Sequence, residues 1–286
     1  MPFKIHDIHK LLSPFLVTGL SGSELTEVER EILSAAPPAG VILFHRNVKN
    51  IGQLRRLTGD VRDIVEDVSG ITPLIMADHE VGRISVLSAA IGMPPSQMAA
   101  WAPGSAELLE SITRQTARRI RNCGLNLTLS PVADVASEPL NPVIGTRAFG
   151  EDPGPVSDAV RIAVRSIAGE RLLSCLKHFP GHGSTSADSH LSLPVLGKTA
   201  DRLKEEDIPP FTAGIEEGAD LVMTAHIALG EGDLPACLDR GIVTDMLRGE
   251  IGFEGVVITD ALEMAGALPD RIAMRSVDPS AGDKSG

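Results

Sequence analysis

The segment 177–190 holds the densest group of side chains suited to chemistry in this sequence. Lys177 and His178 end an apolar run, and a segment rich in Gly and Pro follows them. Asp188 stands two residues before His190, where its carboxylate can bind one ring nitrogen, fix the tautomer and raise the basicity of the imidazole. We therefore expect His190 to act as a general acid/base near neutral pH. A rigid strand would aim Lys177 and His178 at ligand hydroxyls.

Asp260 ends a second apolar run, Val256–Thr259. Burying a carboxylate without a partner is costly, so this position needs hydrogen bonds, an ion pair or a catalytic task. The alternative is that Asp260 caps a helix that begins at Ala261. A further candidate, Arg147, lies in the loop 141–153, whose composition also fits ordinary turn chemistry.

Short apolar runs rich in Val, Ile and Leu alternate with amphipathic segments along the chain, which is typical of repeated βα units. Continuous apolar runs indicate parallel strands that are buried on both faces. We expect strands at 15–18, 41–44, 73–77, 125–129, 172–176, 221–224 and 256–259.

Helical spacing of apolar residues separates these runs, and turn or capping residues mark the helix ends. One predicted helix carries Leu108, Ile112, Ala117 and Ile120 on one face, and Gly124 is placed to end it. The helix that ends near Ala35 has two candidate caps, which are Ser21 with Glu24 and Thr26 with Glu29.

Most predicted strands are followed at once by polar residues, which are Asp78-His79-Glu80, Asp134, Lys177-His178, His226 and Asp260. The carboxyl ends of barrel strands converge on one face, and active sites are built there. The sequence therefore predicts an α/β fold of the parallel TIM-type (β/α) barrel. An open doubly wound sheet is the alternative, but the first strand lacks a Gly-rich phosphate fingerprint.

The composition limits which classes of partner the protein is expected to bind. The 286 residues include 26 Lys and Arg against 38 Asp and Glu, a net charge of −12. Such a charge repels phosphate backbones and anionic membranes, so we expect neither nucleic acid nor membrane as a partner. The three cysteines predict no disulfide framework. No apolar run approaches the roughly 20 residues of a membrane span, and the first residues lack a signal-peptide pattern, so we expect a cytoplasmic protein.

These runs together resemble the β-N-acetylglucosaminidase (β-hexosaminidase) branch of glycoside hydrolase family 3. The most specific part is Lys-His-Phe-Pro-Gly-His-Gly at 177–183, which leads to Asp-Ser-His at 188–190. The resemblance spans about 40–264 and includes 78–80, 141–153 and 252–260.

The resemblance implies a retaining exo-glycosidase that removes terminal, non-reducing β-linked N-acetylglucosamine without metal or cofactor. In bacterial relatives the usual substrates are muropeptides from cell-wall recycling. Asp260 would be the nucleophile, and His190, oriented by Asp188, would replace the usual carboxylic acid/base. The sugar would be held by Asp78, Arg147, Lys177 and His178. Some members of the family transfer the sugar to phosphate instead of water, and the sequence leaves that choice open.

Four positions depart from the family pattern, and each departure except the first removes a charge near the expected sugar site. Val81 replaces a glycine, Val86 replaces a sugar-contacting arginine, Thr146 replaces an acidic residue and Ala261 replaces an aspartate.

No eighth strand is recognisable after Asp260. We therefore expect one glycosidase-like barrel domain over 1–265 that lacks the eighth βα unit, and an irregular tail over 266–286. Such a barrel would expose edges on its first and seventh strands and invite an oligomer or a complementing chain. The alternative function is a truncated, catalytically impaired glycosidase-like module that binds sugar or another protein.

A metal-dependent hydrolase is a further alternative, because imidazoles and carboxylates at barrel strand ends can bind zinc. The spacing does not demand this site. Its ligands would come from His178, His182, His190, His226, Asp188 and Asp260.

Overall fold

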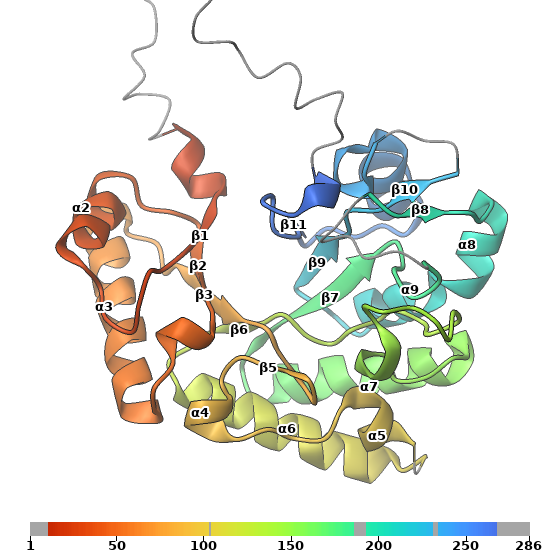
Figure 1. The fold of residues 1–286 in the computed structure, drawn as a ribbon, viewed down its shortest axis with the longest axis horizontal. Helices are drawn as coiled ribbons and strands as arrows, with labels where there is room; N and C mark the ends of the chain where they lie inside the picture. The colour runs from red at the N-terminus through yellow and green to blue at the C-terminus, as the bar shows by residue number, and fades with distance from the viewer. Residues whose placement is uncertain (1–10, 103, 186–192, 231–233, 268–286) are drawn as a thin grey trace, which may run out of the picture.

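A curled sheet of seven parallel strands forms the centre of the computed structural model, which describes residues 11–102, 104–185, 193–230 and 234–267 (Figure 1). The strands lie in the order β1-β2-β3-β6-β7-β9-β11, so each strand pairs with the strand of the next βα unit along the chain. This order confirms the expected parallel α/β fold, with β1 and β11 as sheet edges among the described residues. The strands are β1 (Val17–Gly19), β2 (Gly40–Leu43), β3 (Leu74–Ala77), β6 (Leu127–Thr128), β7 (Leu173–Phe179), β9 (Leu221–Thr224) and β11 (Val256–Thr259).

Helices cover one face of this sheet. In Figure 1, α2 and α3 lie beside the first strands, α6 and α7 run below β6 and β7, and α8 and α9 flank the later strands. Two large apolar clusters fill the space between these helices and the sheet. The helices are α2 (Glu27–Ala35), α3 (Ile51–Ser69), α4 (Ser88–Ile91), α5 (Gln97–Trp101), α6 (Ala106–Asn122), α7 (Pro153–Gly169), α8 (Ala200–Glu206), α9 (Pro209–Glu216) and the π-helix η5 (Gly241–Glu250).

Local sequence signals set the helix ends. Thr26 and Glu29 form the capping box of α2, so the helix begins at Glu27, and the alternative cap at Ser21 is wrong. Gly124 follows α6 with φ +90°, a conformation that glycine adopts without strain. A Cβ at this position would lie 2.1 Å from Oγ1 of Thr58.

Several strand boundaries differ from the expectation, and β6 covers only Leu127–Thr128 of the expected 125–129. Pro14 lies in a 3₁₀ turn, η1 (Ser13–Phe15), so β1 begins only at Val17. β7 continues to Phe179, which places Lys177 and His178 inside the strand and not after it.

The face away from the helices is apolar at its base and charged at the carboxyl ends of the strands. Because side chains alternate along a strand, every second residue points to this inner face. The inner rows are Leu74, Met76 and Asp78 from β3, Leu173, Cys175 and Lys177 on β7, and Ile258 and Asp260 from β11. The three strands therefore deliver Asp78, Lys177 and Asp260 to one end of the sheet.

Two small pairs of strands were not expected from the sequence. β4 (His79–Val81) and β5 (Ile84–Ser85) form an antiparallel hairpin directly after β3, and β8 (Val195–Leu196) pairs with β10 (Ala228–Leu229). Most of the expected tail, 268–286, lies outside the described residues. Within the described residues, no helix is long and apolar enough to cross a membrane.

Candidate active site

The ammonium group of Lys177 is the centre of the site. Its side chain is 2% exposed, and Nζ lies 2.6 Å from Oδ1 of Asp78 and in contact with a carboxylate oxygen of Glu80. Burial would lower the pKa of Lys177, but the two carboxylates more than compensate and raise it. Lys177 is therefore a permanent cation, and Asp78, whose side chain is 30% exposed, is its solvent-facing partner.

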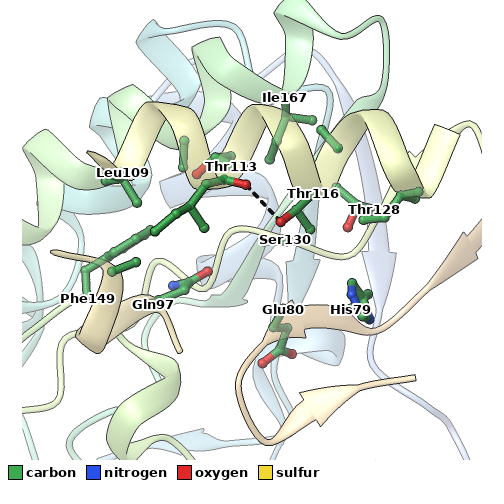
Figure 2. Close-up of a pocket in the computed structure, with 15 residues that line it drawn as sticks. His79, Glu80, Gln97, Leu109, Thr113, Thr116, Thr128, Ser130, Phe149 and Ile167 are labelled. Carbon is green, nitrogen blue, oxygen red and sulfur yellow. Dashed lines mark hydrogen bonds between the residues drawn. The ribbon is translucent and has the colours of Figure 1, made fainter. Parts of the chain in front are cut away.

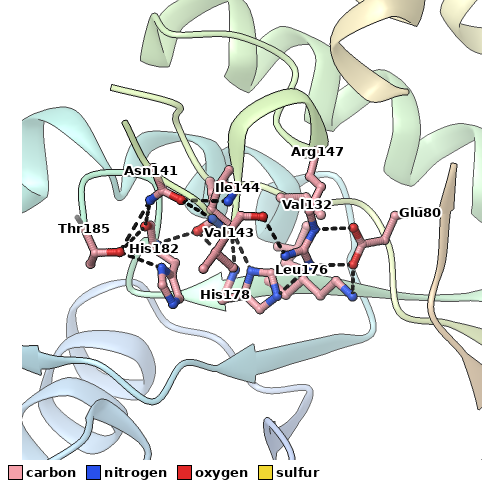
Figure 3. A network of polar contacts seen from close by, with 12 residues as sticks. Glu80, Val132, Asn141, Val143, Ile144, Arg147, Leu176, His178, His182 and Thr185 are labelled. Carbon is pink, nitrogen blue, oxygen red and sulfur yellow. Dashed lines mark hydrogen bonds and ion pairs between the residues drawn. The ribbon is translucent and has the colours of Figure 1, made fainter. Parts of the chain in front are cut away.

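Arg147 completes this charge cluster from the loop before α7. It binds both oxygens of the buried Glu80 carboxylate, at 2.7 Å each, which is the bidentate geometry that guanidinium favours. Burial would raise the pKa of Glu80, but Lys177 and Arg147 hold it well below its usual range. Figure 3 shows the guanidinium of Arg147 facing the carboxylate of Glu80.

His178 joins the cluster to a second carboxylate. Arg147 can only donate a hydrogen bond, so Nε2 of His178, 3.2 Å from Nη2, is the acceptor. The proton of His178 is therefore on Nδ1, which donates to Oδ2 of the fully buried Asp134 at 2.7 Å. Asp134 also accepts the backbone N–H of His182 at 2.6 Å. Burial would raise the pKa of Asp134, but its contacts with His178 and His182 lower it.

The segment after β7 is tightly anchored up to Thr185. Asn141 donates to the carbonyl of His182 at 2.8 Å, and Thr185 contacts Nδ1 of His182 (Figure 3). A Cβ on Gly183 would lie 1.8 Å from the carbonyl oxygen of Val135, so this glycine is required by close backbone approach. The segment that continues from this anchor, 186–192, contains Asp188 and His190 and lies outside the described residues.

Asp260 follows β11 on the same inner face. Its Oδ1 accepts the N–H of Ala261 at 2.8 Å. Burial would raise the pKa of Asp260, but nearby His178, the N–H of Ala261 and the ammonium of Lys177 lower it. No α-helix begins at Ala261 in the described part of the chain, where a 3₁₀ turn, η6 (Ala265–Ala267), follows instead. The helix-cap interpretation is therefore wrong, and Asp260 is an ionised carboxylate at the site.

The structure brings together five of the seven residues singled out from the sequence, and the other two, Asp188 and His190, lie outside the described residues. The five are Asp78, Arg147, Lys177, His178 and Asp260. Glu80 and Asp134 received no role from the sequence, although both follow predicted strands. Their position directly after a strand was the signal that could have identified them. The sequence does not show which side chain each carboxylate would contact.

The departures from the family pattern have visible consequences at this end of the sheet. Val86 is buried in the apolar cluster between the sheet and the helices around α3. Arg83 instead reaches the loop before η3 (Gly145–Arg147), where it donates to the carbonyls of Val143 and Ile144.

A small cavity of about 40 Å³ lies behind the charge cluster, between the sheet and α6 (Figure 2). Glu80 and His79 line it, together with residues such as Thr116 and Thr128. Nδ1 of His79 accepts the N–H of Leu87 at 3.2 Å, so Nε2 carries the proton. Burial, together with nearby His45, lowers the pKa of His79 to about 4, so its ring is neutral near pH 7.

Among the described residues, no three or more His, Cys, Asp or Glu side chains are arranged to hold a metal ion. The ligands of the alternative metal site include Asp188 and His190, and both lie outside the described residues. The three cysteines are free.

A curled parallel sheet with charged groups at the carboxyl ends of its strands defines a barrel-type enzyme site. The family model named "Glycosyl hydrolase family 3 N terminal domain" matches residues 7–277. The chain therefore belongs to glycoside hydrolase family 3, as its sequence motifs indicated.

Three similar proteins carry related names. A beta-hexosaminidase from Chromobacterium violaceum is 38% identical over 261 residues, which cover 88% of this chain and 71% of that protein. The structure of a family 3 beta-N-acetylglucosaminidase from Paenibacillus sp. matches with TM-score 0.87 and 31% identity over 96% of this chain. The chain spans about half, 51%, of the Paenibacillus enzyme. The NagZ structure from Neisseria gonorrhoeae, in complex with N-trifluoroacetyl-D-glucosamine, matches with TM-score 0.79 and 32% identity, covering 87% of this chain and 74% of that one.

Glu80→Gln tests the buried charge cluster. Removing the carboxylate charge leaves Lys177 and Arg147 together without their shared partner, so we expect a loss of about 3–5 kcal/mol in the free energy of unfolding. Urea unfolding at pH 7 measures it. The control is Asp60→Asn, which breaks the exposed pair of Asp60 with Arg30 and should cost less than about 1 kcal/mol. Equal losses in the two variants would contradict a cluster that depends on Glu80.

His79→Asn tests the neutral, buried imidazole, because the amide oxygen can still accept the N–H of Leu87. The folded-state pKa of about 4 lies below the usual value of 6.5, so the unfolded chain binds more protons between these pH values. Wild type should therefore lose roughly 3 kcal/mol more than the variant between pH 7 and pH 4. Parallel curves of unfolding free energy against pH would refute the neutral state.

Proposed function

We propose that the chain is a retaining exo-glycosidase that hydrolyses terminal, non-reducing β-linked N-acetylglucosamine. The observation that carries the proposal is the cluster of Lys177 with Asp78 and Glu80, beside which the ionised Asp260 ends β11. The names of the related enzymes favour hydrolysis over a non-catalytic sugar-binding module. The N-acetylglucosamine analogue bound to the Neisseria protein supports the same substrate class.

Asp260 is the nucleophile of this proposal. Its carboxylate attacks the anomeric carbon and forms a covalent glycosyl-enzyme while the glycosidic C–O bond breaks. His190, oriented by Asp188, donates its proton to the leaving oxygen. In the second step His190 takes a proton from water, whose oxygen displaces Asp260 from the anomeric carbon. A carboxylate that stays ionised suits the nucleophilic role, because a proton on Asp260 would abolish attack.

Asp78, Arg147, Lys177 and His178 are the proposed sugar-binding residues. Asp78 is the most exposed of the group that holds Lys177, so its free oxygen is the natural acceptor for a sugar hydroxyl. The buried pair of Glu80 and Arg147 fixes the remaining partners before any ligand arrives. Such preorganisation reduces the entropy that binding would otherwise cost.

A muropeptide from cell-wall recycling is the proposed natural substrate, and a cytoplasmic location is proposed with it. Because Val86 replaces a sugar-contacting arginine, we expect the sugar to bind less tightly than it would with that charged contact present.

Asp260→Asn tests the proposal, because it keeps the size of the side chain and removes the nucleophilic charge. Wild type should release the chromophore from an aryl β-N-acetylglucosaminide, and the variant should lose about 1,000-fold or more in kcat. The matched control is Asp245→Asn, on the exposed surface of η5, which should leave kcat unchanged. A folded wild type without turnover would overturn the proposed function, as would full activity in Asp260→Asn.

A further inference from the structure

The strand that carries Asp260 is held from one side. Among the described residues β11 pairs with β9 and with no other strand, and Val256 at its start is 52% exposed. A carboxylate that must meet one carbon atom needs its backbone fixed within a fraction of an ångström. The contacts between β9 and the end of β11 therefore decide where Asp260 lies.

The backbone on both sides of Asp260 is bound by the end of β9 and by His226, which follows it. On one side the N–H of Asp260 donates to the carbonyl of Thr224 at 3.1 Å, continuing the strand ladder. On the other side Nε2 of His226 lies 2.9 Å from the carbonyl oxygen of Ala261. The second contact is beyond the reach of the ladder, because the chain turns away from β9 after Asp260.

The contacts of His226 fix its tautomer. A carbonyl oxygen can only accept, so Nε2 of His226 carries a proton and donates it to Ala261. When Nε2 carries the only ring proton, Nδ1 is an acceptor, and Sγ of Cys237 lies 3.4 Å from it. The thiol S–H therefore points at Nδ1, and burial raises the pKa of Cys237 to about 11, which keeps the thiol protonated.

Cys237 is itself tied to the exit of β9. It lies in a 3₁₀ turn, η4 (Ala236–Leu238), where the N–H of Ala236 donates to the carbonyl of Ile227 at 2.7 Å. His226 is 1% exposed, so its ring has no room to leave this arrangement without a change in its neighbours. The order of contacts is thus Cys237 to His226, His226 to Ala261, and Ala261 N–H to the carboxylate of Asp260.

We propose that His226, held by Cys237, is a positioning residue. It binds the carbonyl of Ala261, fixes the backbone of that residue and thereby directs the carboxylate of Asp260, which accepts the N–H of Ala261. The inference rests on the proposed role of Asp260. It extends that role to His226, which the sequence offered as a ligand of the alternative metal site, and to Cys237, to which the sequence gave no role. Among the described residues β11 pairs on one side only, and His226 with Cys237 adds a restraint that the ladder with β9 does not give.

The kinetic test compares Cys237→Ala, Cys237→Ser and His226→Phe with wild type on an aryl β-N-acetylglucosaminide. A misplacement of about 1 Å can cost 100-fold, so His226→Phe should lose about 10–100-fold in kcat with KM changed less than about twofold. Cys237→Ala should lose about three- to tenfold, and Cys237→Ser, which keeps a donor for Nδ1, should recover most of that loss. Cys123→Ala, a buried cysteine at the end of α6, is the matched control and should keep wild-type kcat.

Nitrogen-15 NMR of the histidine side chains at pH 8 tests the geometry without reference to activity. We expect the His226 signal, assigned by its loss in His226→Phe, to show the neutral form with its proton on Nε2. A proton on Nδ1 would overturn the inference. So would a wild type that turns over while folded His226→Phe keeps its kcat, or equal kcat in Cys237→Ala and Cys237→Ser. If His226→Phe does not fold, the comparison of kcat between Cys237→Ala and Cys237→Ser still tests the inference. Absence of turnover in wild type would instead overturn the proposed function.

Discussion

The buried ammonium of Lys177 is the constraint on which the rest of the site depends. A cation that is 2% exposed is tolerable only with opposite charges in contact, and Asp78 and Glu80 supply them from the end of β3. Glu80 in turn needs Arg147, which brings the loop before α7 over the sheet, and Arg147 sets the tautomer of His178. The end of β3, the end of β7 and the loop before α7 are thus placed by charges that neutralise one another.

The two halves of the site are held by different means. Asp78, Lys177 and His178 come from strands with neighbours on both sides, and their buried carboxylates and cations lock them together. The nucleophile candidate Asp260 follows β11, which pairs with β9 alone among the described residues. Backbone contacts with Thr224 and His226 hold this segment. The ion-paired residues form a rigid sugar-binding part of the site, and backbone contacts hold Asp260. This arrangement suits a reaction in which the sugar stays fixed while bonds to Asp260 form and break.

Alternation along the strands made much of this predictable. The seven apolar runs located the strands, and Asp78, Lys177 and Asp260 fall in step with the inner apolar rows, so their convergence could be read from the sequence. The partners could not be, since nothing local shows that Glu80 binds Arg147 or that Asp134 binds His178. Those pairs join segments 67 and 44 residues apart and depend on tertiary packing. The start of β1 was misjudged because Pro14 favours a turn, and the roles of Asp188 and His190 stay predictions.

Covalent attack by Asp260 on a sugar held by the charge cluster would leave a glycosyl-enzyme, and trapping this intermediate is the most direct test. Wild-type protein is mixed with an activated aryl β-N-acetylglucosaminide, quenched with acid within the first turnover and digested for peptide mass spectrometry. We predict that the peptide containing Asp260 gains the mass of one N-acetylglucosaminyl group, with the label on that carboxylate. Turnover with the label on another residue, or with no labelled peptide in the wild type under conditions where the intermediate must accumulate, would contradict the account.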